Sequence, residues 1–565
     1  AVTNKGTINV AQAGLAAFVA PTVKNSGVIN ASLGKVAFAA GEKVTVDMYG
    51  DKLVEIAVDD KLEDALLENT GKINAGGGQV TLSTQVAKSV VDNVINMEGV
   101  TRVASVEQQG GKVVLKGGDN GNVRVAGEMD ASGKQGGGSV DIRGRDIEVT
   151  QNASVDASAK DNGDGGQIIA FADNDLFFSG SFAARGGKNG GDGGFIETSA
   201  KQNVDIAGDI STLAPAGNAG QWLIDPANLE IIDNGSNISS VDSKFKPDSD
   251  TSKLSVTTLE AALDNGNVTV QTLENVGSTG EAGDIIVSTA IDNNGNSTSL
   301  TLEAWNNINV NDDITMGRAS VNGADVNGGD LTLKAGYDVQ NEEFRSVEAP
   351  DVKPDIFVGD NAKIKTNGGN VNFEASNNIT LTNDELLSGN TPDTKINTSS
   401  ADNNGGRVEF KAREGNISLN KSKIDSRSVD VAGGDVDLTA ANGNISLDKS
   451  WIETNSLESD HEGGQVDIDA SHGYISLTES KISTGFGTNN QGLGNKVTIT
   501  AGGTDSDDNS VSLTGNSSIT ALSPNDKVGG NIEVKNDGIF TGVAESLKTN
   551  NGGAITLSQN EGGSI

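Results

Sequence analysis

The sequence predicts an all-β protein whose fold is a parallel β-helix, or β-solenoid, rod with a few loops and short helices outside the regular coils. Three observations indicate this fold. A Gly-Gly pair followed by an alternating apolar strand recurs along the chain, each recurrence holds three short strands, and the 565 residues include only 14 Phe, 3 Trp and 3 Tyr. So few large side chains could not fill several wide cores, whereas a narrow interior of stacked strands needs few of them.

The Gly-Gly pairs set the period of the predicted fold. They recur at intervals of 27 to 33 residues in the first run, and a regular spacing of this length is typical of repeat architectures. We expect glycine at these corners because the turns need a positive φ. The first glycine of each pair is Gly77, Gly110, Gly137, Gly165 and Gly193, and then Gly328, Gly368, Gly405, Gly433, Gly463, Gly529 and Gly552.

Each period holds three segments of about four to six residues that alternate apolar and polar side chains between turn residues, so one repeat forms one triangular coil. If the coils stack in register, equivalent apolar residues form columns that fill the interior. The expected columns are Val436, Val466 and Val497; Ile445, Ile475 and Val511; and Ile424, Ile452, Ile482 and Ile519. Two polar columns are expected beside them, namely Asn378, Asn416 and Asn444, and Ser422, Ser450 and Ser480.

The repeat is interrupted over residues 222–300. A polar loop there precedes a pattern over residues 257–266 that predicts a two-turn helix, and a second helix is expected over residues 60–68. We interpret the loop and the helix as an excursion from one corner of the solenoid, a position that often carries binding or braces the rod. The expected N-cap, inward residues and C-cap are Thr257 or Thr258, then Leu259, Ala262 and Leu263, then Asn265 and Gly266.

Charge and composition exclude several classes of partner. The chain has 41 Lys and Arg against 78 Asp and Glu, a formal charge of −37, so nucleic acid and anionic lipid surfaces would be repelled. No membrane span is expected, because the longest uncharged apolar stretch, residues 14–20, is far shorter than the roughly 20 residues that cross a bilayer. The absence of cysteine excludes disulfides and thiolate metal sites.

Several segments in the first part of the chain carry a family resemblance. Residues 2–8, 18–29 and 36–41 resemble the later part of the secretion domain of two-partner secretion exoproteins. Residues 190–199, 221–226 and 258–270 are similar to filamentous-haemagglutinin-like proteins and high-molecular-weight non-pilus adhesins. These motifs occur in the family's order and cover residues 1 to about 335, whereas only the generic solenoid repeat continues beyond them.

The resemblance implies a right-handed parallel β-helix that is exported through an outer-membrane partner transporter barrel. It also implies display as a fibre for adhesion or biofilm cohesion, in an extracellular position at the surface of a Gram-negative cell. Expected contacts are cell-surface glycans, matrix polysaccharide or other copies of the chain. One departure concerns export, because the Asn-Pro motifs that the family places early in its secretion domain are absent.

The same reading divides the chain into four regions. Residues 1–75 would be the C-terminal part of a secretion-domain-like β-helix, residues 76–221 a stalk, residues 222–300 the family-specific segment, and residues 301–565 a second stalk that continues beyond the chain end. Both ends cut into the pattern, so we expect a section of a longer protein that forms one continuous rod. A delivery stalk of a contact-dependent toxin system is the alternative function.

We expect no enzymatic activity. The only histidines, His461 and His472, lie eleven residues apart and predict surface turns. Parallel β-helices include polysaccharide-processing enzymes whose catalysis uses clustered carboxylates with a basic partner. Carboxylates abound in this sequence, but no dense basic partner accompanies them. A β-helical polysaccharide-processing enzyme is therefore the least favoured reading.

Two kinds of binding site are candidates. Asp161, Asp164 and Asp192 lie in Gly-rich corner loops whose oxygen atoms could bind Ca²⁺, the one cofactor that the sequence suggests, although these loops could also be plain turns. Aromatic rings can stack on the apolar face of a sugar. The candidates for such a glycan contact are Trp305, Trp451 and Tyr474, and shielding of the rod's flank is their alternative role.

Overall fold

The computed structural model confirms a parallel β-helix and places the chain in two compact units, Ala1–Glu281 and Ala282–Ile565. In each unit, successive coils contribute one strand to each of three parallel sheets. We call them the first, second and third sheet, in chain order from the Gly-Gly corner. The structure describes all residues except 41–43, 47–55, 59–64, 87–92, 106–109, 234–237, 242–243, 248–250, 273–282, 294–296, 318–327, 346–352, 458–460, 486–492, 507–508, 524–526, 543–545, 551 and 560–565.

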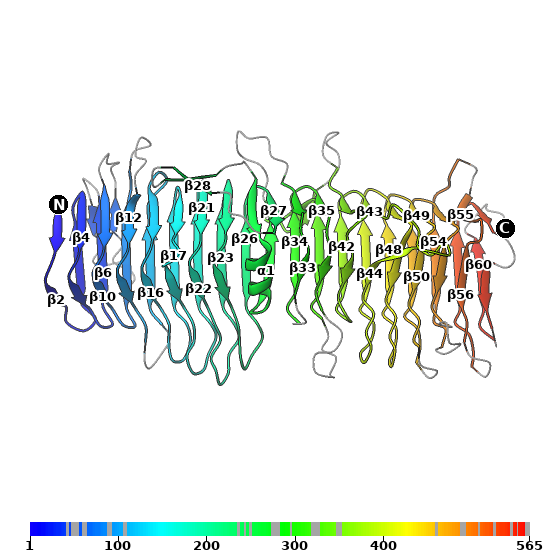
Figure 1. Ribbon diagram of the computed structural model, residues 1–565, viewed down its shortest axis with the longest axis horizontal. Helices are drawn as coiled ribbons and strands as arrows, with labels where there is room; N and C mark the ends of the chain where they lie inside the picture. The colour runs from blue at the N-terminus through cyan, green and yellow to red at the C-terminus, as the bar shows by residue number, and fades with distance from the viewer. Residues whose placement is uncertain are drawn as a thin grey trace. The chain divides into compact units, whose positions relative to one another are not determined.

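The strands of unit 1 follow the order of the coils (Figure 1). The first sheet contains β3 (Leu15–Val19), β6 (Lys35–Ala40), β11 (Gln79–Thr84), β14 (Lys112–Lys116), β17 (Ser139–Gly144), β20 (Gln167–Ala172), β23 (Phe195–Ala200), β26 (Gln221–Asp225) and β31 (Asn267–Gln271). The second contains β1 (Val2–Asn4), β4 (Thr22–Asn25), β9 (Leu66–Asn69), β12 (Asn93–Met97), β15 (Asn122–Val125), β18 (Ile147–Val149), β21 (Asp175–Phe178), β24 (Asn203–Ile206), β27 (Leu229–Ile232) and β30 (Ser252–Ser255). The third contains β2 (Thr7–Asn9), β5 (Val28–Asn30), β10 (Lys72–Asn74), β13 (Val100–Arg102), β16 (Glu128–Asp130), β19 (Ser154–Asp156), β22 (Ser181–Ala183) and β25 (Asp209–Ser211).

Unit 2 repeats the arrangement, from green to red in Figure 1. Its first sheet contains β34 (Leu300–Ala304), β37 (Leu331–Ala335), β42 (Val371–Ala375), β45 (Val408–Ala412), β48 (Val436–Ala440), β51 (Val466–Ala470), β54 (Val497–Ala501), β57 (Ile532–Asn536) and β60 (Ile555–Gln559). Its second contains β32 (Ile285–Val287), β35 (Ile308–Val310), β40 (Ile356–Val358), β43 (Ile379–Thr382), β46 (Ile417–Asn420), β49 (Ile445–Asp448), β52 (Ile475–Thr478), β55 (Asn509–Thr514) and β58 (Ile539–Thr541). Its third contains β33 (Ile291–Asp292), β36 (Ile314–Thr315), β41 (Ile364–Lys365), β44 (Asp393–Asn397), β47 (Ser422–Asp425), β50 (Trp451–Glu453), β53 (Lys481–Ser483), β56 (Ser518–Ala521) and β59 (Leu547–Thr549).

Within the described residues, three antiparallel hairpins lie outside this pattern. They pair β7 (Val44–Val46) with β8 (Ile56–Val58), β28 (Ile238–Val241) with β29 (Lys244–Pro247), and β38 (Tyr337–Asp338) with β39 (Glu343–Phe344). Among the described residues, no helix is long and apolar enough to span a bilayer. The four predicted regions and the single continuous rod stay predictions.

The predicted interior register of unit 2 is confirmed. Val436 is opposite Val466 and Val466 is opposite Val497 in the first sheet, and the two isoleucine columns pair in the same way in the other sheets. All of these side chains are fully buried. Each strand alternates buried and half-buried residues, because neighbouring side chains of a strand point to opposite faces.

The two polar columns are also confirmed, but most of their bonds run to the backbone; the exception is a long bond from Asn416 Nδ2 to Asn378 Oδ1 at 3.4 Å. In the serine column, the Ser422 amide donates to Ser450 Oγ at 3.1 Å, and the Ser450 amide donates to Ser480 Oγ at 2.9 Å. In the asparagine column, each Oδ1 accepts the amide of the next coil at 2.8 Å, from Asn378 to Asn416 and from Asn416 to Asn444. These side chains therefore satisfy backbone donors at the corners, where the strand ladder is interrupted.

The prediction that the Gly-Gly corners need a positive φ is wrong for most pairs. Among the paired glycines only Gly77, Gly368 and Gly552 have a positive φ. The common requirement is close approach, since a Cβ on the second glycine would overlap the backbone of the neighbouring coil. A Cβ on Gly434, for example, would overlap the carbonyl oxygen of Gly406, and one on Gly464 that of Gly434. Glycine is needed there because the coils touch through their main chains.

The helix of the interrupted region is confirmed with different bounds. Helix α1 (Val256–Leu263) begins after Ser255, which is the N-cap in place of the predicted threonines, and Asp264 is the C-cap. The helix starts earlier because the second-sheet strand β30 extends to Ser255 and leads directly into it. Leu259, Ala262 and Leu263 are buried, as predicted.

Helix α1 is not an excursion from a corner. It lies between β30 and β31 in the chain, so it takes the place of a third-sheet strand, and it contacts β25, the last strand of the third sheet of unit 1. An uncovered edge strand would expose unpaired backbone groups. The helix therefore covers an edge of this sheet. The second helix was predicted over residues 60–68. Its last three residues, Leu66 to Glu68, belong to strand β9, so the prediction is wrong for them. Residues 60–64 lie outside the described residues.

Candidate functional site

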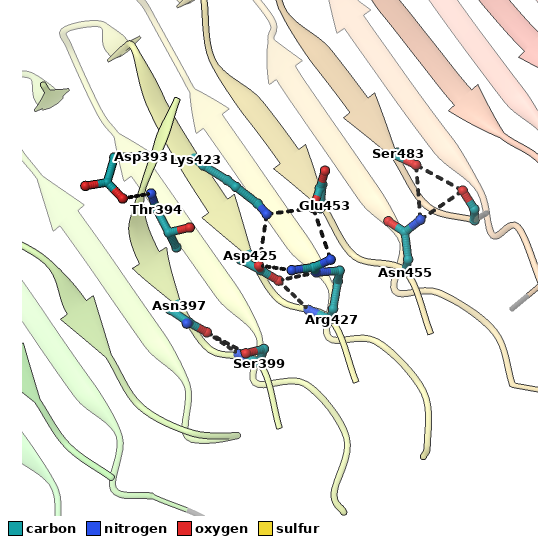
Figure 2. Close-up of polar contacts among 11 residues, drawn as sticks. Asp393, Thr394, Asn397, Ser399, Lys423, Asp425, Arg427, Glu453, Asn455 and Ser483 are labelled. Carbon is teal, nitrogen blue, oxygen red and sulfur yellow. Dashed lines mark hydrogen bonds and ion pairs between the residues drawn. The ribbon is translucent and has the colours of Figure 1, made fainter. Parts of the chain in front are cut away.

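The outer face of the third sheet of unit 2 carries the best-defined group of polar side chains. Figure 2 shows two cations and two anions from β47, β50 and the turn after β47, which we call the charged network: Lys423, Asp425, Arg427 and Glu453. Lys423 Nζ lies 3.0 Å from Asp425 Oδ2 and 2.7 Å from Glu453 Oε2. Arg427 binds Asp425 through Nε at 2.8 Å and through Nη2 at 2.6 Å.

Asp425 and Lys423, the two most buried members of the charged network, are shielded from water. Only 5% of the Asp425 side chain is exposed, and only 12% of the Lys423 side chain. Burial alone would raise the pKa of Asp425, but hydrogen bonds and attraction from Arg427 and Lys423 outweigh it and lower that pKa below its usual value. Asp425 therefore stays ionised, and the formal charges of the four side chains cancel, which suits a fixed surface feature rather than a proton donor.

Trp451 lies beside this network and points outward, as predicted. Its position in β50 pairs with Lys423 on one side and Lys481 on the other. Lys481 Nζ lies 4.1 Å from the centre of the indole ring, within cation–π range. The indole is half-buried and is flanked by Lys423 and Lys481. A ligand that stacks on the ring would therefore also contact these two lysine side chains.

The other two aromatic candidates lie elsewhere, so the structure does not bring the three into one site. Trp305 and Tyr474 both lie in turns between the first and second sheets, several coils apart. Arg345 stacks on Trp305 at 4.0 Å from the ring centre and donates to its carbonyl oxygen at 3.0 Å. The amide of Tyr474 donates to Asn444 Oδ1, at the end of the asparagine column.

The calcium candidates have partners from the chain itself. Asp161 Oδ1 forms an ion pair with Lys188 at 2.8 Å. Asp164 Oδ1 accepts the amide of Asp192, and Asp192 Oδ1 accepts the amide of Asn218, each at 2.8 Å. These contacts favour the plain-turn alternative, and within the described ranges no group of three His, Cys, Asp or Glu side chains could hold a metal ion. A calcium site at these residues stays a prediction.

Two buried titratable groups were not anticipated from the sequence. Lys395 is fully buried, and its ammonium group donates to the carbonyl oxygens of Gly359, Asp360 and Ala362 at 2.7 to 3.0 Å. Burial lowers the pKa of Lys395 to about 8. The strand pattern hides this lysine, because a bulge between Thr394 and Ile396 turns it from the outer face to the interior.

Asp225, at the end of β26, is the second unanticipated group. Burial, with a smaller contribution from the nearby Glu197 carboxylate, raises the pKa of Asp225 to about 7. Asp225 Oδ1 is buried without a hydrogen-bond partner, and burial also raises the pKa of Glu197. Its outward position next to Ile224 predicts an ordinary surface carboxylate, so no signal in the sequence marks it. Arg143 is the basic group near the pair, and its attraction only partly offsets the effect of burial on the pKa of Glu197.

Comparison with known proteins assigns no family. No protein-family model and no curated protein matches this chain.

Proposed function

We propose that the chain is a section of a secreted, surface-displayed fibrous adhesin or biofilm-matrix scaffold, exported by two-partner secretion, that acts in cell–cell or cell–surface adhesion. The observation that carries this proposal is the stacking of coils in each unit, where every sheet grows by parallel pairing with the equivalent strand of the next coil. Because each coil contacts only its neighbours, such a fold gains length by repetition. Length and stiffness are what a stalk that presents contacts away from a cell requires.

The export route rests on the sequence motifs. The segments that resemble secretion-domain and adhesin motifs lie in unit 1, in β1 to β6, β23, β26 and the region of α1. A chain without cysteine can cross an oxidising compartment unfolded without forming disulfides. We infer an extracellular location at the bacterial surface and an outer-membrane transporter barrel as the export partner.

The surface chemistry favours contacts with neutral or cationic partners. A net charge of −37 repels anionic glycans and other copies of the chain at low ionic strength. The outward indole of Trp451, beside a neutral charged network, offers one place where a sugar ring could stack without meeting a net negative charge.

A bead assay tests adhesion directly. Beads coated with the folded chain are mixed with bacterial cells and with immobilised neutral polysaccharide, and beads coated with heat-unfolded chain serve as the control. We expect only the folded chain to cluster beads on cells or matrix, and to do so more strongly as ionic strength rises. Equal clustering by both coatings, or a loss of polysaccharide viscosity that indicates cleavage, would contradict the proposal.

A separate experiment tests export. The neighbouring gene is examined for a transporter barrel and is then co-expressed with the gene of this protein. We expect the protein at the cell surface only when the barrel is present, whereas surface display without any such partner would contradict two-partner secretion.

A further inference from the structure

A polar groove lies at the corner between the third and first sheets of unit 2. Its larger part has a volume of about 610 Å³ and an adjoining part about 250 Å³, and both are lined by Asn370 and Arg407. We call it the corner groove. Its larger part is further lined by Asp402, Asn403, Asn404, Val431 and Asp435 and by the corner glycines Gly368, Gly405, Gly433 and Gly434.

The glycines explain why this corner is hollow. A Cβ on Gly405 would overlap the carbonyl oxygen of Ser426, and a Cβ on Gly433 would overlap that of Thr454. Close stacking of the coils thus forbids side chains on the floor, and the loops on either side rise above it. The groove is a consequence of the same main-chain contacts that define the repeat.

The walls of the groove are held in place by the stacking of two loops. Ser400 and Ser428 form a parallel bridge, and Ser428 Oγ donates to the carbonyl oxygen of Asn403 at 2.7 Å. The amide of Asp430 donates to the carbonyl oxygen of Ala401 at 3.0 Å. The loop that carries Asn403 and Asn404 is therefore preorganised, which lowers the entropy cost of binding a ligand there.

The groove presents hydrogen-bonding groups that the protein itself does not use. Within the described part of the chain, the side-chain amides of Asn403 and Asn404 and the Nδ2 group of Asn370 have no hydrogen-bond partner. Arg407 is fixed by Asp437, with Nε at 2.8 Å and Nη2 at 2.6 Å from Oδ2. A fixed guanidinium, the two free carboxamides of Asn403 and Asn404 and the free Nδ2 group of Asn370 supply paired donors and acceptors, the pattern that vicinal hydroxyl groups match.

We propose that the corner groove binds a neutral oligosaccharide. Val431 is the one apolar side chain lining its larger part, so a lipid or an apolar peptide finds no surface there. Asp402 and Asp435 outnumber the single cation Arg407, so an acidic glycan is repelled. The groove runs across successive coils about 4.8 Å apart, a spacing close to the rise of one sugar unit in an extended glycan.

Binding is measured by titration calorimetry on the full chain. The probes are cellotetraose, maltotetraose and tetra-N-acetylchitotetraose, with tetragalacturonic acid as the acidic counterpart. We expect at least one neutral probe to bind and the acidic probe not to bind. Arg407→Gln and the double variant Asn403→Ala with Asn404→Ala should each weaken binding at least tenfold. Circular dichroism and melting curves confirm that both variants fold.

Two matched variants make the test specific. Arg143→Gln removes an equally exposed arginine of unit 1 that pairs with Asp141, and it should leave binding unchanged. Asn203→Ala removes an outward asparagine of unit 1 that donates to Asp175 Oδ1, and it should also leave binding unchanged. No binding of any neutral probe, or binding that is lost in the unit 1 variants but kept in the groove variants, would overturn the proposal.

This inference deepens the proposed adhesive function, but the two can fail separately. Binding of a tetrasaccharide by a chain that does not cluster beads would support the groove and contradict adhesion. Bead clustering that persists in both groove variants would support adhesion and contradict a role for the groove in it.

Discussion

The third sheets of the two units differ in the side chains that face the interior. In unit 2 the interior column contains isoleucine in eight successive strands and then a leucine, from Ile291 to Leu547. In unit 1 the equivalent column begins with three isoleucines and then changes residue type at each coil: Ile8, Ile29, Ile73, Thr101, Met129, Val155, Phe182 and Ile210. A uniform column keeps each coil interchangeable with the next, whereas a mixed column requires each coil to match its own neighbours.

The two units also differ in how they use the outer surface. Unit 1 carries helix α1 and the aspartate corners, whose carboxylates are occupied by the chain. Unit 2 carries all three candidate aromatic residues and the corner groove with its unused amides. We infer that unit 2, whose coils share the same interior residues, can vary its outer side chains without disturbing its core. Its outer positions are therefore available for binding.

The largest effect is expected from a charge in the uniform column. Ile452→Asp would place a carboxylate in a fully buried position between Ile424 and Ile482, and it should destabilise unit 2 by more than about 3 kcal/mol. Urea unfolding and limited proteolysis measure the loss. Thr520→Asp, an outward half-buried position of the same sheet, is the control and should change stability by less than about 0.5 kcal/mol.

Glu453→Lys is not a suitable control, although its outward position predicts a silent change. Glu453 binds Lys423 at 2.7 Å, so a lysine there would add a third cation to the charged network. Equal protease resistance of Ile452→Asp and Thr520→Asp would contradict the register of the uniform column.

The next effect tests the mixed column. Phe182 is 1% exposed and contacts Phe178 with ring centres 4.6 Å apart. Phe182→Ala should cost about 3–5 kcal/mol, because the neighbouring coils, with Val155 and Ile210, cannot refill the space. Ile482→Val in unit 2 should cost only about 0.5–1.5 kcal/mol. A loss below about 2 kcal/mol for Phe182→Ala would contradict tight packing of the mixed column around this ring.

A pH-dependent effect is expected in unit 1. The pKa of Asp225 is about 7 in the folded chain and near its ordinary value of 3.8 when unfolded. The fold therefore loses stability as pH rises between these values, and the full penalty remains above pH 7. Asp225→Asn should stabilise the protein by about 2–4 kcal/mol at pH 8 and by little at pH 4. A gain that is the same at both pH values would contradict burial as the cause.

The smallest effect concerns the serine column of unit 2. Ser450→Ala removes the acceptor of the buried Ser422 amide and should cost about 1–2 kcal/mol. Ser446→Ala, which removes a half-buried outward hydroxyl bonded to Ser418 Oγ at 3.2 Å, should cost less than about 0.5 kcal/mol. Hydrogen exchange at Ser422 gives a local readout, and an unchanged exchange rate in Ser450→Ala would contradict the ladder.

Sequence periodicity was sufficient for the fold and for the register of unit 2, because identical residues recur at identical positions there. Periodicity predicted less wherever the residues or the length of one coil differ from those of its neighbours. The start of α1 was misplaced because β30 continues to Ser255, and Lys395 was taken to the interior by a bulge of one residue. The corner groove could not be predicted, since it arises from loops that become neighbours only when coils stack.

Bead adhesion by unit-specific variants tests the central proposal of this account, that the protein is adhesive and that outer positions of unit 2 make its contacts. The unit 2 variant combines Arg407→Gln, Asn403→Ala and Trp451→Ala in the full chain. The unit 1 variant combines three outward changes of matched type, Arg143→Gln, Asn203→Ala and Phe171→Ala. We expect clustering on cells or neutral polysaccharide to fall at least tenfold in the unit 2 variant and to stay unchanged in the unit 1 variant. Loss of clustering in the unit 1 variant alone, with both variants folded, would contradict the account.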